Sequence, residues 1–280
     1  MEITAAQVKQ LRDATGSGMM DCKRALVQAN GDFAAADKIL KEMGLAAVAK
    51  RQDRATDNGR VFVKANEKTV VMLEVSCETD FVAANAKFVE LGEKLCSTVL
   101  DKGYTEINDE LNDMVKSLIA VIKENMSLKK LLVLPIVEGH FVSTYLHGPG
   151  AMGVVVEFAT DKIEIANNPI VKEFANDCAL HVAAFTPSYL EVKSVPQSYI
   201  DEQLSIFKVQ VKDLQKPEKV LEGIVRGKLN KHLGEICFLN QAFVKDETMN
   251  VEKKMTEVAK EVGAKLSIVS FHYFVAGVNA

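Results

Sequence analysis

Histidine and cysteine, the side chains that most often bind metals or attack substrates, are scattered through this sequence of 280 residues. No pair of histidines has the H-E-x-x-H spacing, and no cysteine and histidine are spaced as in a zinc site. Gly16–Lys23 contains glycines and a lysine, but not at the spacing of a phosphate-binding loop, and G-x-S-x-G is missing. Tertiary contacts could still assemble a site, yet the local patterns predict no catalytic residue, no bound metal and no cofactor. The residues concerned are His140, His147, His181, His232 and His272, and Cys22, Cys77, Cys96, Cys178 and Cys237.

Two methionines, Met19 and Met20, stand where a helix is expected to begin, directly after the bend Gly16-Ser17-Gly18. Methionine adapts to irregular gaps, so the local pattern favours a role in the core. The alternative is that the two side chains contact another protein.

The segment Thr79-Asp80-Phe81-Val82 follows an expected strand and opens an expected helix that runs to about Leu100. The simplest interpretation is local: Thr79 or Asp80 caps the helix, and Phe81 packs against it. The alternative is an exposed apolar side chain beside a carboxylate, displayed on the turn between strand and helix.

A third segment, His147-Gly148-Pro149-Gly150, is typical of a tight turn that presents an imidazole. A single histidine in such a turn is usually only solvated, and a contact with a partner is the alternative.

The elements that must position these segments begin with a small helical module at residues 1–50. Apolar spacing and turn residues predict three helices, with Gly16 ending the first, Asp32 capping the third and Gly44 just past its end. A polar stretch with an Asn58-Gly59 turn signal follows, and we interpret residues 51–60 as a linker.

An internal repeat organises the remainder. A shift of 83 residues aligns VMLEV at 71–75 with VVVEF at 154–158, and Asn85 with Asn168. Each copy is expected to be a strand pair followed by a helix, so we predict an α+β fold with a duplicated core, its halves at 61–140 and 141–280. Within the second half, helical spacing on both sides of Pro217 predicts an antiparallel coiled-coil hairpin at about 196–233.

Composition and charge narrow the class of protein. Lys and Arg number 34 against 38 Asp and Glu, for a net charge of −4, which does not favour direct nucleic-acid binding. No apolar run is long enough for a membrane span, no secretory signal is visible, and the odd number of cysteines is not a disulfide framework. We expect a soluble, reduced, cytoplasmic protein that does not bind membranes.

Several of these strings together resemble the bacterial elongation factor Ts family, guanine-nucleotide exchange factors for elongation factor Tu. The resemblance spans nearly the whole chain, and its first two strings are highly specific. The strings are LRDATGSGMMDCKRAL at 11–26 with ANGD at 29–32, CETDFVA at 77–83, IKENMSL at 122–128, YLHG at 145–148, HVAA at 181–184 and LNQAFV at 239–244.

The resemblance implies a ubiquitin-associated-like N-terminal module, a duplicated α+β core and a coiled-coil hairpin. It implies no chemistry by the chain itself, which would bind elongation factor Tu in its GDP-bound and nucleotide-free states and promote release of GDP. By this resemblance Thr79, Asp80, Phe81 and Val82 disturb the partner's magnesium site, with Phe81 intruding. Arg12, Met19 and Met20 would contact the partner's nucleotide-binding domain, and His147 and Gly148 would form a further contact from the core.

The chain departs from the family pattern at a few positions. Lys129 and Lys130 replace a common arginine pair, Phe185-Thr186 follows HVAA, and Pro149-Gly150 alters the turn after His147. These departures concern the contacts of the second half. Two other classes, a small-molecule enzyme and an adaptor acting through residues 1–50 alone, remain as alternatives.

Overall fold

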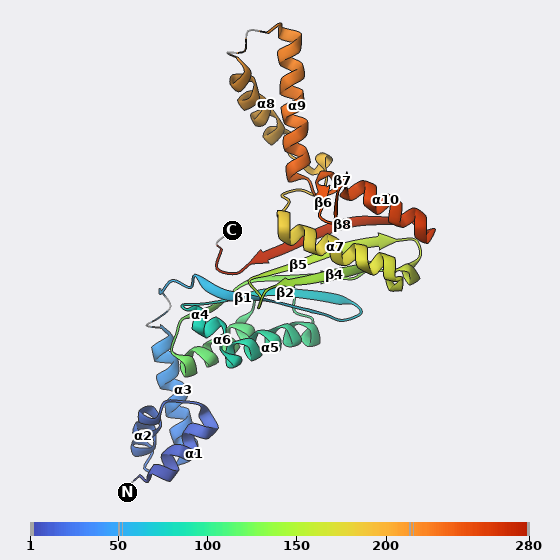
Figure 1. Cartoon of the computed structure of the whole chain (residues 1–280). Helices are drawn as coiled ribbons and strands as arrows, with labels where there is room; N and C mark the ends of the chain where they lie inside the picture. Colours follow the sequence, from blue (N-terminus) through green and yellow to red (C-terminus); the bar gives the residue numbers. More distant parts are fainter. Residues whose placement is uncertain (1–2, 50, 52, 213, 215, 279–280) are drawn as a thin grey trace. The chain divides into compact units, whose positions relative to one another are not determined.

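The computed structural model describes residues 3–49, 51, 53–212, 214 and 216–278, which form two compact units (Figure 1). The first unit comprises the described residues up to 135 with 146–153 and 274–278, and the second comprises 136–145 and 154–273. Both contain helices and strands, so the predicted α+β class is confirmed. Parts of the predicted N-terminal module (1, 2 and 50), Gln52 of the predicted linker, Asp213 and Gln215 of the predicted hairpin and the chain end at 279–280 lie outside the described residues.

The first unit begins with three helices: α1 (Ala5–Thr15), α2 (Met19–Gln28) and α3 (Phe33–Ala49). Gly16 ends α1 in the left-handed conformation at φ 69°, where glycine is tolerated without strain. Asp32 accepts hydrogen bonds from the backbone amides of Ala34 and Ala35 and so caps α3. The small core between the helices is formed by Val8, Leu11, Cys22, Ala25, Leu26, Ala36 and Leu40.

Helix α3 is longer than the sequence predicts, because Gly44 does not end it but lies within it. The reason is a close approach to helix α6 (Asp109–Ile122). A Cβ atom on Gly44 would lie 2.5 Å from the Cβ of Ala120, so only glycine allows this contact. Glycine at position 44 is therefore required by the contact between α3 and α6, although local sequence rules predict that a glycine there ends the helix.

The sheet of the first unit contains β1 (Asn58–Ala65), β2 (Thr69–Cys77) and β3 (Met126–Pro135), with β2 in the centre and both neighbours antiparallel to it. Helices α5 (Ala86–Lys102) and α6 cover one face of this sheet (Figure 1). Phe62, Val71 and Leu73 bury their side chains against Phe88 and Leu95 of α5. This packing fixes the end of β2, from which the segment Thr79–Val82 continues.

The sequence predicts one helix from Thr79 to about Leu100, and the structure has two. Helix α4 (Asp80–Ala83) stops after one turn, and α5 begins after Asn85, whose side chain accepts a hydrogen bond from the amide of Lys87. Asn85 is thus the N-cap of α5, and asparagine is a residue type that favours the start of a new helix at this position.

A second sheet has the order β4–β5–β8, with β4 (His140–His147), β5 (Met152–Thr160) and β8 (Leu266–Val275), and most of its residues belong to the second unit. Helix α7 (Pro169–Phe185) follows β5. The bounds of β5 and α7 are those of β2 and α5 shifted by 83 residues. Asn168 caps α7 as Asn85 caps α5, which supports the predicted duplication.

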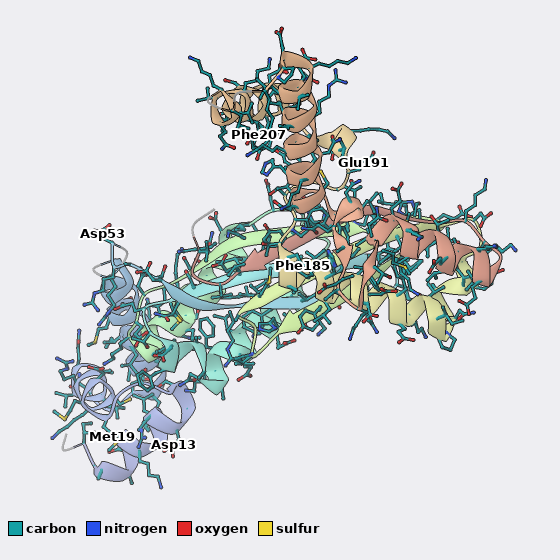
Figure 2. The ribbon with its side chains drawn as sticks, turned by 45° about the horizontal axis from the view of Figure 1, so that its top comes forward. Asp13, Met19, Asp53, Phe185, Glu191 and Phe207 are labelled. Atoms are coloured by element: carbon teal, nitrogen blue, oxygen red, sulfur yellow. The ribbon has the colours of Figure 1, made fainter. Side chains whose placement is uncertain are left out.

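Helices α8 (Gln197–Val211) and α9 (Glu218–Ile236) form a helical hairpin in the second unit. They are antiparallel, since Tyr199 bonds to His232 and Gln210 to Lys228. Phe207 of α8 (Figure 2) lies edge-on to the ring of His232. The remaining elements of this unit are β6 (Ala242–Phe243), β7 (Asp246–Asn250), α10 (Val251–Val262), and the short 3-10 helices η1 (Ile163–Asn167), η2 (Val192–Ser194) and η3 (Phe238–Asn240). Residues 246–250 form β7, and the side chain of Asn250 caps α10. Among the described residues, every helix is too short or too polar to cross a membrane.

The close contact at Gly44 gives a first prediction. Alanine normally stabilises a helix by about 0.5–1 kcal/mol relative to glycine, yet Gly44→Ala is expected to lower the melting temperature because its Cβ would collide with Ala120. The matched control is Gly227→Ala in α9, where a Cβ meets no atom within 4 Å and a small increase is expected. A second substitution, Ala120→Gly, should restore part of the loss, and a stabilised Gly44→Ala protein would contradict the contact.

The cysteines give a second prediction. All five are buried, and burial raises the pKa of Cys77 and of Cys96 to about 12. Because the thiolate is the reactive form, the native chain should react with a thiol reagent at pH 8 far more slowly than the denatured chain, in which all five are expected to react. Rapid modification of native protein would contradict this burial.

Candidate functional site

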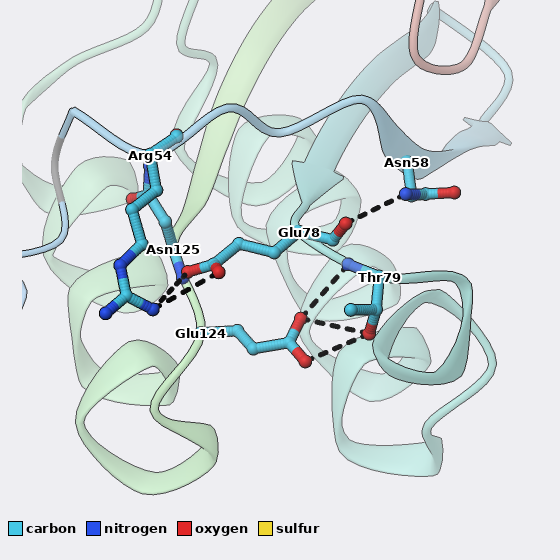
Figure 3. Close-up of polar contacts among 6 residues, drawn as sticks. All are labelled: Arg54, Asn58, Glu78, Thr79, Glu124 and Asn125. Carbon is cyan, nitrogen blue, oxygen red and sulfur yellow. Dashed lines mark hydrogen bonds and ion pairs between the residues drawn. The ribbon is translucent and has the colours of Figure 1, made fainter.

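The turn after β2 is held by hydrogen bonds to every polar atom of Thr79. Its amide and its hydroxyl both donate to the carboxylate of Glu124, at 2.9–3.1 Å (Figure 3). Its hydroxyl oxygen also accepts from the amide of Val82, at 3.3 Å, and so caps α4. Its carbonyl accepts from the amide of Ala83 and from the thiol of Cys77. Thr79 is therefore the N-cap, and its conformation is fixed from both sides.

Glu78 fixes the same turn one residue earlier. Its carboxylate accepts a hydrogen bond of 2.6 Å from the amide of Asn125 and pairs with Arg54 at 3.3 Å (Figure 3). Its carbonyl accepts from the side chain of Asn58, and the side chain of Asn125 donates to the carbonyl of Arg54. The strings CETDFVA and IKENMSL, separate in the sequence, thus form one hydrogen-bonded cluster.

The two residues that follow Thr79 point into solvent. Phe81 is 82% exposed, while its neighbours Val82 and Ala83 are buried. The carboxylate of Asp80 accepts from the amide of Phe81 and is exposed as well. The structure therefore contradicts the interpretation that Phe81 packs against the fold or that Asp80 is the cap. The exposed phenyl group of Phe81 thus follows a residue, Thr79, that hydrogen bonds hold in place.

Met19 (Figure 2) and Met20 are also exposed. The exposed fraction is 44% for Met19 and 68% for Met20. The reason is helical geometry. Cys22, Ala25 and Leu26 occupy the buried face of α2, which places Met20 on the opposite face and Met19 at its edge. The interpretation of these methionines as core residues is wrong. Arg12, in the last turn of α1, is exposed too.

An ion pair brings α2 next to the cluster around Thr79. Asp21, which follows Met20, pairs with Lys123 and with Arg24. The hydrogen bond from Lys123, and after it that from Arg24, holds the pKa of Asp21 below its usual range. Lys123 contacts Asp21, next to Met20, and the following residue, Glu124, contacts Thr79. These two consecutive residues therefore connect the segment around Met19 and Met20 with the segment Thr79–Val82.

The third segment, His147 and Gly148, closes the turn between β4 and β5. The carbonyl of His147 accepts from the amides of Gly150 and Ala151, and Gly148 has φ 55°. Gly150 has φ 98°, and its carbonyl accepts from the amide of Val61, which holds the turn against β1. All nine predicted site residues thus belong to the first unit.

Glu78, Glu124 and Asn125 are functional candidates that our sequence reasoning did not identify. The strings that contain them are quoted above, but nothing in their local pattern says that a glutamate after one helix reaches a threonine 45 residues earlier. Within the described part of the chain, no group of three or more His, Cys, Asp or Glu side chains is arranged to hold a metal ion.

The profile of the family described as "Elongation factor TS" matches residues 78–278, which include Glu78, Thr79, Glu124 and Asn125 of this cluster. The chain belongs to the elongation factor Ts family. Its similarity to curated members spans the full length. It is 49% identical over 279 residues to "Elongation factor Ts" of Treponema denticola, with all of both chains covered. It is 46% identical over 290 residues to the protein of that name from Treponema pallidum, again over all of both chains. With that of Borrelia duttonii it shares 44% identity over 278 residues, covering 99% of this chain and all of the relative. The similarity to these relatives also covers the residues that precede 78, where the profile match begins.

Exposure of Phe81 and Met20 gives a third prediction. Phe81→Ala and Met20→Ala should each change the free energy of unfolding by less than about 0.5 kcal/mol, because exposed side chains contribute little to stability. Phe88→Ala, a fully buried phenylalanine in the helix that follows, serves as the matched control and should cost about 3–5 kcal/mol. Chemical denaturation of the three variants measures this. A loss for Phe81→Ala as large as that for Phe88→Ala would show that Phe81 is part of the core.

Proposed function

We propose that the chain promotes release of GDP from elongation factor Tu by disturbing the partner's magnesium and nucleotide site, after which GTP can rebind. The observation that carries this proposal is the exposure of Phe81 on a turn whose base is hydrogen-bonded at every polar atom. Membership of the elongation factor Ts family supports the choice of partner. The chain would act in the cytoplasm, bind neither nucleic acid nor membrane, and make or break no bond.

The mechanism follows from linkage between two ligands of one protein. If the chain binds best to a partner whose magnesium site is deformed, nucleotide and magnesium must weaken its binding by the same factor as it weakens theirs. A contact of equal strength in both states shifts nothing. Asp80 and Phe81 are proposed to supply the unequal part of the binding. Arg12, Met19, Met20, His147 and Gly148 supply contacts common to both states.

A binding adaptor that uses only the N-terminal helices is the second candidate, and the exposure of Met19 and Met20 favours it. The adaptor and the exchange factor predict different effects of Met20→Ala and Phe81→Ala on GDP release. For an adaptor, Met20→Ala weakens complex formation and Phe81→Ala has no effect. For an exchange factor, Phe81→Ala lowers the rate of GDP release even when the partner is saturated.

The fourth prediction concerns that rate. Burial of a phenylalanine contributes about 1.5–3 kcal/mol, so Phe81→Ala should slow release of labelled GDP from elongation factor Tu by roughly ten- to a hundred-fold. Asp80→Ala should have a smaller effect, because Thr79 and not Asp80 caps α4. Excess magnesium should oppose exchange by the unmodified chain. Stopped-flow measurements at several magnesium concentrations test this, and a normal rate for Phe81→Ala would reject the proposed mechanism.

A further inference from the structure

The carboxylate of Glu124 is the one group that receives both donors of Thr79 among the contacts of the described residues. Glu124 is not part of the strand, turn or helix that it supports. It lies in the short segment between α6 and β3, 45 residues further along the chain. Its side chain is only partly buried, and it lies outside the hydrophobic core. Its described contacts are those with the turn.

The backbone on either side of Glu124 is itself fixed. Lys123 ends α6 in the left-handed conformation at φ 68°, which is uncommon for a residue with a side chain. The amide of Asn125 donates to Glu78 and its side chain donates to Arg54, which define the start of β3. A left-handed residue before Glu124 and two hydrogen bonds after it hold the backbone of Glu124 in place, with its carboxylate within hydrogen-bond distance of Thr79.

We propose that Glu124 is a positioning residue for nucleotide exchange, acting through Thr79 on Phe81. This inference rests on the function proposed above. An exposed aromatic ring on a loose turn must be ordered when it binds, and that ordering opposes binding. A turn held beforehand by two charge-assisted hydrogen bonds avoids this loss. Glu124 thus acts in the step that deforms the partner's site, without touching the partner.

The first test compares Glu124→Ala and Glu124→Gln with the control Asp113→Ala. Asp113 is a carboxylate on α6 that pairs with Lys116 at the surface, 2.8 Å away, and does not contact the turn. The full chain catalyses GDP release from elongation factor Tu, and kcat and KM are measured separately. We expect Glu124→Ala to lower kcat about ten-fold with less than about a two-fold change in KM. Glu124→Gln retains one acceptor oxygen and should give a smaller decrease, and Asp113→Ala should give none.

The second test is a double-mutant cycle that combines Glu124→Ala with Phe81→Ala. A purely structural role of Glu124 predicts no coupling between the two substitutions in the exchange rate. If Glu124 acts only through Phe81, Glu124→Ala should slow exchange by less than about two-fold in a chain that already carries Phe81→Ala. Additive effects would overturn the proposal.

The outcomes separate this inference from the proposed function. A slow Phe81→Ala variant with normal Glu124→Ala and Glu124→Gln variants rejects the positioning role alone. A normal Phe81→Ala variant rejects both. If thermal unfolding shows that Glu124→Ala is poorly folded, Glu124→Gln decides, since it keeps the size of the side chain. A normal kcat for folded Glu124→Gln would then overturn the proposal.

Discussion

The hydrogen bonds between Thr79 and the carboxylate of Glu124 are the interaction on which the exposed part of this molecule depends. Because Thr79 also caps α4, one threonine determines both where the strand ends and where the short helix begins. Val82 and Ala83 turn inward on that helix, and Phe81 is left in solvent. A phenylalanine that is 82% exposed contributes little to the stability of the free chain through burial, and most of its apolar surface remains available for a contact with another protein.

The internal repeat accounts for the strands and helices of the two halves, but not for the turn at Thr79. Both halves place a buried glutamate in the central strand, Glu74 beside Lys130 at 3.2 Å and Glu157 beside His140 at 2.7 Å. The segment equivalent to α4 in the second half is the 3-10 helix η1, and Lys162 at its start makes no side-chain cap. The hydrogen-bonded turn with an exposed aromatic ring is therefore a feature of the first copy alone within the described residues. The two copies share this architecture, and the proposed contact through Phe81 lies in the first copy.

Sequence reasoning predicted the elements that local rules determine. The Gly16 and Asp32 caps and the 83-residue period follow from turn chemistry and periodicity. It was wrong where a tertiary contact replaces a local rule, as at Gly44. It was also wrong about Met20, although the signal was present: a helix that starts at Met19 and buries Cys22, Ala25 and Leu26 must expose Met20. For Glu124 no such signal exists, since its partner is distant in the sequence and only the fold brings the two together.

The central claim is that Phe81 distinguishes two states of elongation factor Tu, and equilibrium binding tests it most directly. The dissociation constant of the chain for the GDP-bound partner should be measured calorimetrically over a range of magnesium concentrations. We predict that affinity falls as magnesium rises, that Phe81→Ala largely removes this dependence, and that Met20→Ala weakens binding by the same factor at every magnesium concentration. An unchanged magnesium dependence in Phe81→Ala would contradict the account.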